Sequence, residues 1–141
     1  MKKNNRMLEG FTLVEILIVV VIIGILATVA IPTYFKYVER GYASDAKVQI
    51  KNILGSAELS RQETGQWPTD VETMIADGYI ELKASILNKW EFTVQLEDGD
   101  NGTSGQLSAT SLPAMHGGEG HQVTYLVDEG EYIGYGQKRQ E

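Results

Sequence analysis

The architecture of this chain follows from residues 10–32, which read GFTLVEILIVVVIIGILATVAIP. The 21 residues from Phe11 to Ile31 carry a single charge, Glu15. At 1.5 Å per residue, a helix of that length spans roughly 31 Å, about the thickness of the hydrocarbon core of a bilayer. The segment before it carries three basic residues, Lys2, Lys3 and Arg6. Because basic flanks stay on the cytoplasmic side, the pattern predicts a membrane anchor whose C-terminal part is exported.

Two other interpretations of the apolar run are open. One is the core helix of a soluble protein, although a helix that is apolar on every face needs more protein around it than the rest of this chain provides. The other is a secretory signal peptide with a small-residue cleavage site at Thr28-Val29-Ala30. Glu15 favours the anchor, because a carboxylate inside the apolar run costs about 2.5–3.5 kcal/mol on insertion scales and calls for a partner.

Gly10-Phe11-Thr12-Leu13-Val14-Glu15, placed between a short basic leader and an unbroken apolar run, resembles the N-terminus of type IV pilins and pseudopilins. The resemblance implies that a prepilin peptidase cuts after Gly10 and methylates the new amine of Phe11. It also implies that Glu15 pairs with the Phe11 amine of a neighbouring subunit during assembly. Such pairing is physically sound, since each charge is costly alone in hydrocarbon and pairing offsets much of that cost.

Two residues weaken the helix predicted for the apolar run. Pro32 lacks a backbone N–H and clashes with the carbonyl of Thr28, so we expect a kink or break just before it. Gly24 costs about 1 kcal/mol relative to alanine in a helix. In similar pilins the matching segment can lose helicity in the assembled fibre, so the resemblance implies a melting segment from Gly24 to Pro32. The alternative is a packing glycine in a curved helix.

Four aromatic residues follow the apolar run closely: Tyr34, Phe35, Tyr37 and Tyr42. Directly after a membrane span, this pattern is typical of an aromatic belt at the membrane surface. The alternatives are aromatic packing between subunits inside a fibre and electron transport along it.

The rest of the chain predicts an α+β fold in which one long helix packs against a four-stranded antiparallel sheet. Apolar residues recur at helical spacing from Lys36 to about Glu63, so the transmembrane first half continues into an amphipathic second half. A short helix capped by Thr69 or Asp70 follows. Strands are expected at 90–96, 105–112, 122–127 and 131–135, with exposed Gly-rich loops at 98–105 and 116–120. The organisation is then a leader at 1–10, a transmembrane or fibre-core helix at 11–35, its continuation at 36–64, and a loop and sheet domain at 65–141.

Composition excludes several kinds of function. The chain has 141 residues, and the absence of cysteine rules out disulfides and thiolate ligands. Its net charge of −7 argues against a specific nucleic-acid partner. His116 and His121 lie five apart without a metalloprotease motif, and Asp98-Gly99-Asp100-Asn101-Gly102 lacks the glutamate of an EF-hand. Asn101-Gly102-Thr103 fits a glycosylation acceptor. We expect no metal, no cofactor and no catalytic site, and we therefore expect that the protein is not an enzyme.

These observations predict a structural protein, the subunit of a type IV pilus-like filament assembled by helix packing. Its expected partners are further copies of itself, the prepilin peptidase, the inner-membrane assembly machinery and, before assembly, the lipid bilayer. We expect the precursor in the bacterial inner membrane and the filament at the cell surface, where adhesion, twitching motility, DNA uptake and electron transfer are open as roles. The close alternative is a periplasmic pseudopilin of a type II secretion system. An alternative of a different class is an exported binding domain with an ordinary signal peptide.

Overall fold

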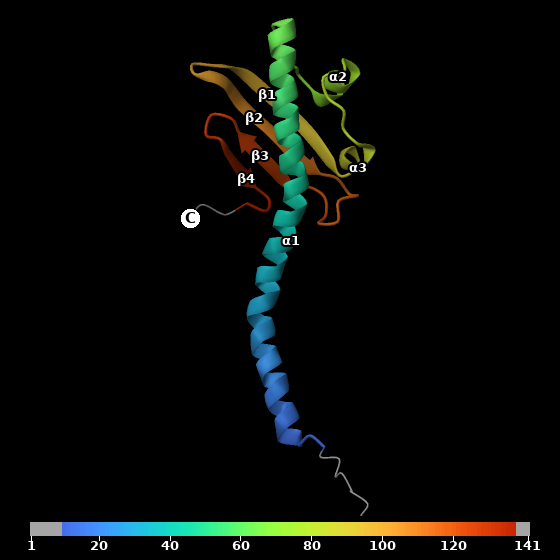
Figure 1. The fold of residues 1–141 in the computed structure, drawn as a ribbon, viewed down its shortest axis with the longest axis vertical. Coiled ribbons are helices and arrows are strands. Elements are labelled where there is room, and N and C mark those ends of the chain that lie inside the picture. The colour runs from blue at the N-terminus through green and yellow to red at the C-terminus, as the bar shows by residue number, and fades with distance from the viewer. Residues whose placement is uncertain (1–9, 138–141) are drawn as a thin grey trace, which may run out of the picture. The chain divides into compact units, whose positions relative to one another are not determined.

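A computed structural model describes residues 10–137 of the chain. Residues 1–9 of the expected leader therefore lie outside the described residues. The chain divides into two compact units, Met1–Phe35 and Lys36–Glu141. Within the described part the elements are α1 (Leu13–Thr64), α2 (Val71–Ala76), α3 (Ala84–Leu87), β1 (Trp90–Gly99), β2 (Gly102–Ser111), β3 (Gln122–Leu126) and β4 (Glu131–Gly134) (Figure 1).

The helix α1 is continuous over 52 residues, and Pro32 lies inside it. The helix therefore does not break before Pro32. A proline removes one bond of the helical ladder, and the neighbouring bonds hold the helix together. The hydroxyl of Thr28 donates to the Gly24 carbonyl at 2.9 Å, and that of Thr33 donates to the Val29 carbonyl at 3.1 Å. By length and composition α1 qualifies as a membrane-spanning helix, as the sequence predicts.

In the second unit, α1 crosses one face of the sheet (Figure 1). Its buried residues follow helical spacing and are mostly small: Ala43, Ala46, Ile50, Ile53, Ala57 and Ser60. Small side chains let the helix approach the sheet closely, and together with the inward residues of the strands they form one hydrophobic core. At the margin of this contact, the Lys51 ammonium lies 3.6 Å from the centroid of the Tyr125 ring, a cation–π interaction between α1 and β3.

The four strands form an antiparallel sheet in the order β1-β2-β3-β4, each paired with its neighbour in sequence. In β1 the alternation of Trp90, Phe92 and Val94 with polar residues matches alternate burial, so one face packs on the core. The predicted α+β arrangement of a long helix on a four-stranded antiparallel sheet is confirmed.

The first hairpin differs from the prediction. The stretch 98–105 was expected to be a loop, but it is strand on both sides of a two-residue tip at Asp100-Asn101, with Gly99 paired to Gly102. Gly102 and Gly105 have φ values of +131° and +111°, so the backbone bends there in conformations that glycine adopts at little cost. Composition alone suggested a loop, because glycines that bend a strand resemble glycines that interrupt it.

Two short helices connect α1 to the sheet. The helix α2 begins after Asp70, whose carboxylate accepts from the Thr73 N–H at 2.7 Å, so of the two expected caps Asp70 is the one used. A hydrogen bond from the Thr73 side chain, followed by this one from the Thr73 N–H, lowers the pKa of Asp70. The helix α3 has four residues and was not predicted, since a single turn carries no periodic signal.

Candidate functional site

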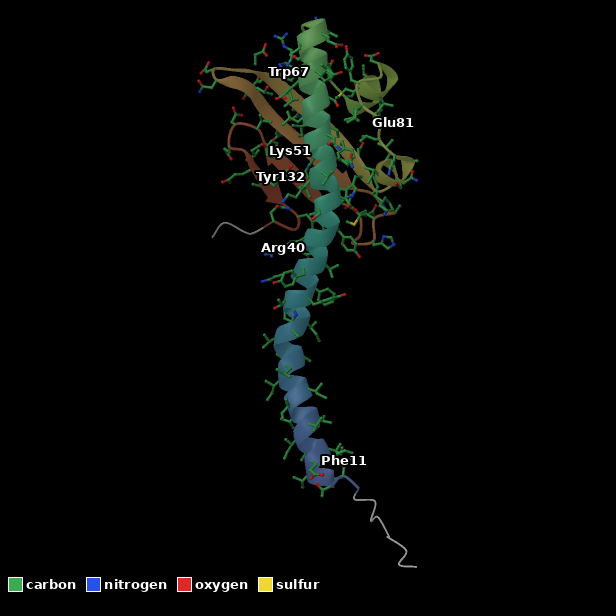
Figure 2. All side chains as sticks on the ribbon, in the orientation of Figure 1. Phe11, Arg40, Lys51, Trp67, Glu81 and Tyr132 are labelled. Carbon is green, nitrogen blue, oxygen red and sulfur yellow. The ribbon has the colours of Figure 1, made fainter. Side chains whose placement is uncertain are left out.

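The chain enters α1 through Gly10, Phe11 and Thr12. Among the described residues, nothing lies within 4 Å of the position that a Cβ on Gly10 would occupy. Phe11, which Figure 2 labels at the start of α1, is 85% exposed. The peptide bond between Gly10 and Phe11 therefore lies just before the helix, at two residues that are both exposed.

The first turn of α1 is closed by a reciprocal pair of hydrogen bonds between Thr12 and Glu15. The Thr12 N–H donates to Glu15 Oε2 at 2.9 Å, and the Glu15 N–H donates to Thr12 Oγ1 at 3.1 Å. This is a capping box, which satisfies two of the N–H groups that every helix leaves unpaired at its start. Thr12 is a residue that the sequence reasoning missed, although the spacing Thr-x-x-Glu before an apolar run is its known signature.

Beyond the capping box, α1 exposes an apolar surface on all sides. The large aliphatic residues from Leu13 to Ile31 are each at least half exposed: Leu13, Val14, Ile16, Leu17, Ile18, Val19, Val20, Val21, Ile22, Ile23, Ile25, Leu26, Val29 and Ile31. A contiguous exposed apolar surface of this size marks a segment that is covered by lipid or by other protein. Among residues 10–35, the described part of the first unit, no other segment covers it.

The four aromatic residues do not behave alike. Tyr34, Phe35 and Tyr37 are exposed, and the rings of Tyr34 and Phe35 meet edge to face with centroids 6.2 Å apart. Tyr42 is half-buried, packs against the hydrophobic core, and stacks on His116 at 6.4 Å. Three of the four are thus exposed at the helix surface, whereas Tyr42 packs within its own domain.

The two histidines stack on different tyrosines. His121 stacks on Tyr135 with ring centroids 4.3 Å apart, and its Nε2 lies 3.0 Å from the Gly117 carbonyl oxygen. His116 stacks on Tyr42 instead. Within residues 10–137 no group of three or more His, Cys, Asp or Glu side chains is arranged to hold a metal ion.

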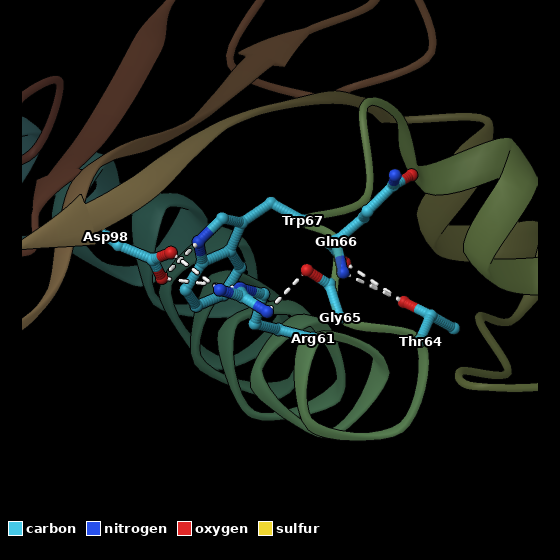
Figure 3. Close-up of polar contacts among 6 residues, drawn as sticks. All are labelled: Arg61, Thr64, Gly65, Gln66, Trp67 and Asp98. Atoms are coloured by element: carbon cyan, nitrogen blue, oxygen red, sulfur yellow. Dashed lines mark hydrogen bonds and ion pairs between the residues drawn. The ribbon is translucent and has the colours of Figure 1, made fainter.

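Asp98, the first acidic residue of the stretch that superficially resembles a calcium loop, is held by Arg61 at the end of α1 (Figure 3). Arg61 Nη2 donates to Asp98 Oδ2 at 2.6 Å, and Trp67 Nε1 donates to Asp98 Oδ1 at 3.0 Å. Arg61 Nη1 also donates to the carbonyl of Gly65. The hydrogen bond from Arg61, followed by that from Trp67, holds the pKa of Asp98 below its usual range.

This clamp of Arg61, Trp67 and Asp98 ties three segments together. It joins the last turn of α1 and the loop after it to the end of β1, across 37 residues of sequence. A charge-assisted contact of this kind fixes the position of the loop, as a cross-link would. It also engages the Asp98 carboxylate with protein donors, which makes that side chain unsuited to a cation site.

Comparison with known proteins finds one family model and several related proteins. Residues 6–31 match the family model of the prokaryotic N-terminal methylation motif. The type IV major fimbrial protein FimA of Dichelobacter nodosus is 43% identical over 70 residues, covering 50% of this chain and 36% of FimA. The type IV major pilin protein PilE1 of Neisseria gonorrhoeae is 33% identical over 95 residues, 67% of this chain and 51% of PilE1. The fimbrial protein EcpC of Eikenella corrodens is 33% identical over 102 residues, 72% of this chain and 61% of EcpC.

The chain thus spans between about a third and three fifths of the length of these relatives. The residues that the family model matches include the expected leader junction, Thr12, Glu15 and the apolar run.

Proposed function

We propose that this chain, which has the N-terminal methylation motif and the fold of type IV pilins, is the structural subunit of a type IV pilus-like filament. The observation that carries the proposal is the uncovered apolar surface of α1 from Leu13 to Ile31, with one carboxylate, Glu15, at its head. A lone exported domain would leave this apolar surface exposed to water, whereas a subunit that moves from lipid into a helix bundle buries it at both stages.

The first step in this proposal is removal of the leader. The prepilin peptidase cuts the bond between Gly10 and Phe11 and methylates the Phe11 amine. The open position of Gly10 supports this step, because a residue without a side chain lets the backbone enter a narrow protease site.

The second step is storage in the inner membrane, from which the assembly machinery extracts the subunit. The apolar part of α1 lies in the bilayer, and the second unit lies outside it. Transfer of the helix from lipid into a fibre core is favoured by van der Waals packing and not by the hydrophobic effect, since lipid tails are as apolar as leucine.

The third step is association of the helices. Glu15 pairs with the Phe11 amine of a neighbouring subunit, which sets the axial register, as buried polar groups can. Gly24 and Pro32 bound a segment that can lose helicity in the fibre. Tyr34, Phe35 and Tyr37 lie where they meet the membrane surface before assembly and neighbouring subunits after it. Tyr42 takes part less, because it packs within its own domain.

The alternatives are less well supported. The similar proteins are major pilins and fimbrial proteins, which favours a surface pilus over the pseudopilus of a type II secretion system. These relatives are structural proteins rather than enzymes. An exported binding domain with an ordinary signal peptide leaves the methylation motif and Glu15 without a role.

Mass spectrometry of the mature N-terminus tests the proposal. A chain that begins at methylated Phe11 supports it, and a chain that begins at Ile31, after an ordinary signal peptide, overturns it. Electron microscopy of cells with and without the gene then tests for the filament. In the same cells, normal filament yield from a Glu15→Ala variant contradicts the role of Glu15 in assembly.

A further inference from the structure

We propose that Asn101 is a site of spontaneous covalent modification, at which the side-chain amide is converted to the carboxylate of aspartate or isoaspartate. The backbone nitrogen of Gly102 makes the attack, so the reaction needs water and no enzyme. The site lies at the tip of the hairpin formed by β1 and β2, which the proposed function leaves without a role. The proposal does not depend on filament assembly.

The reaction has two balanced steps. In the first, the Gly102 nitrogen loses its proton to water and bonds to the side-chain carbonyl carbon of Asn101. The bond from that carbon to Nδ2 breaks, and Nδ2 takes up protons and leaves as ammonia, which gives a five-membered succinimide ring. In the second step, water opens the ring at one of its two bonds to the Gly102 nitrogen. Opening at the side-chain carbonyl gives aspartate, and opening at the main-chain carbonyl gives isoaspartate.

The side chain of Asn101 is accessible in the structure. Asn101 and Gly102 are both exposed, the first in the two-residue tip and the second at the start of β2. Among residues 10–137 the Asn101 amide has no hydrogen-bond partner. Nothing lies within 4 Å of the position that a Cβ on Gly102 would occupy, and Gly102 has no side chain of its own to crowd the ring. Asparagine is a thermally labile residue, and here no contact restrains its amide.

The attacking nitrogen belongs to the last pair of the ladder, in which Gly102 is paired with Gly99. The end of a ladder opens at a lower free energy than its middle, because a neighbouring pair supports it on one side only. Glycine on both strands adds conformational freedom, and Gly102 has a φ of +131°. The nitrogen therefore becomes available by local opening, without unfolding of the sheet.

Two other asparagines within the described part of the chain serve as comparisons. Asn52 lies inside α1 and is followed by Ile53, a β-branched residue that is only 1% exposed. Asn88 is exposed after α3, but the next residue is Lys89, whose N–H donates to the Ile86 carbonyl at 3.0 Å. Of the three asparagines, only the one at the hairpin tip is followed by a residue without a side chain.

Asn101 also begins the glycosylation acceptor motif Asn101-Gly102-Thr103. The hydroxyl that completes this motif is engaged, because Thr103 Oγ1 donates to Glu58 Oε1 on α1 at 3.1 Å. The folded domain thus presents the asparagine without the threonine. This arrangement favours reaction of Asn101 with its own backbone over recognition of the whole motif by a glycosyltransferase.

The modification changes the hairpin tip. Both products add one negative charge beside Asp100, the other residue of the tip. Isoaspartate also lengthens the main chain by one methylene within a two-residue tip, which weakens the pairing of Gly99 with Gly102. Converted and unconverted chains therefore differ in charge and separate on an ion-exchange column.

The test uses the full chain, purified in detergent micelles and incubated at neutral pH and physiological temperature. Peptide mass spectrometry follows the mass gain from amide to carboxylate, and electron-transfer fragmentation distinguishes aspartate from isoaspartate. Gly102→Ala crowds the attacking nitrogen, and Asn101→Gln enlarges the ring that must form. Thr103→Val is the matched control, which removes the acceptor motif and keeps the reacting pair. Tryptophan fluorescence verifies that each variant is folded.

We expect the mass gain at Asn101 in the unmodified chain and at an equal rate in Thr103→Val, with both products present. Gly102→Ala should slow the reaction about tenfold, which corresponds to a barrier higher by about 1.4 kcal/mol. Asn101→Gln should show no mass gain over the same period. The peptides that contain Asn52 and Asn88 should stay unchanged.

Other outcomes overturn the proposal. A mass gain in guanidinium but none in the folded chain would show that the hairpin protects Asn101. Equal rates at Asn52 and Asn88 would show general lability, and a full rate in Gly102→Ala would rule out the proposed role of Gly102. A glycan on Asn101 in the chain isolated from cells, lost in Thr103→Val, would assign the motif to a glycosyltransferase. Each of these results rejects the site and leaves the test of the filament unaffected.

Discussion

Replacing Gly105 by alanine should disrupt the sheet where its two hairpins meet. Gly105 has a φ of +111° and is paired with Leu96 on β1. Its N–H donates to Asp128 Oδ2 at 3.1 Å, and its carbonyl accepts from the Val127 N–H at 2.9 Å. One residue thus joins β1, β2 and the turn that follows β3.

The cost of the substitution has two parts. A non-glycine residue in this backbone conformation carries strain on the order of 1–3 kcal/mol. The added Cβ would also overlap the Gln95 carbonyl oxygen and lie 3.1 Å from the Gln95 carbonyl carbon and 3.2 Å from Leu96 Cα. These are backbone atoms, so β1 must move, and the loss of one or two ladder hydrogen bonds adds about 1 kcal/mol each. We expect the free energy of unfolding to fall by about 2–5 kcal/mol, a large part of the roughly 5–15 kcal/mol typical of a domain.

Gly102→Ala is the matched control for this experiment. Gly102 lies on the same strand with a φ of +131°, but nothing lies within 4 Å of its Cβ position. It should therefore show the strain alone, about 1–3 kcal/mol. The assay is guanidinium unfolding of the full chain in detergent micelles, followed by tryptophan fluorescence, because Trp90 is only 1% exposed at the start of β1.

Equal losses of stability in the two variants would refute the reasoning. That result would mean that the Gln95 backbone yields to the new Cβ without loss of pairing. The register of β1 against β2 would then be set elsewhere in the sheet.

Three further predictions use the same unfolding assay. Gly55→Ala should raise the free energy of unfolding by about 1 kcal/mol, because the glycine is helical and nothing lies within 4 Å of its Cβ position; a loss would show hidden crowding there. Ile50→Ala should lower the free energy of unfolding by about 2–5 kcal/mol, because Ile50 is fully buried. Val48→Ala, on the exposed face of the helix, should change it by no more than about 0.5 kcal/mol. Similar values for the two variants would contradict the packing of α1 on the sheet. Because Arg61 lowers the folded-state pKa of Asp98, the stability from this pair is present above the ordinary pKa of aspartate, about 3.9, and is lost as the pH falls through the lowered value. Asp98→Asn should therefore be less stable than the unmodified chain at neutral pH and converge with it in acid, and an equal deficit at both pH values would rule out the charge as the cause.

Sequence patterns predicted most of the fold because the signals were local and periodic. The end of α1 at Thr64 agrees with the expected end, since Gly65 follows with a φ of +81°. The alternation at 90–96 predicted both the existence of β1 and the face that it buries. The capping box is equally local, and its signature, Thr-x-x-Glu before an apolar run, stands in the sequence at Thr12 and Glu15.

The sequence by itself determined the long N-terminal helix: an apolar segment of membrane length, one carboxylate near its start, and an amphipathic continuation that needs one sheet to cover it. These are properties of neighbouring residues, so periodicity and composition report them. Only the tertiary structure decided how the first hairpin and the loop after α1 are positioned. The pairing of Gly99 with Gly102 and the clamp of Arg61, Trp67 and Asp98 depend on groups that are far apart in sequence or on backbone angles that composition does not reveal. In a domain without cysteine, such long-range hydrogen bonds and the shared hydrophobic core take the place of covalent cross-links, and no local pattern encodes which residues will meet.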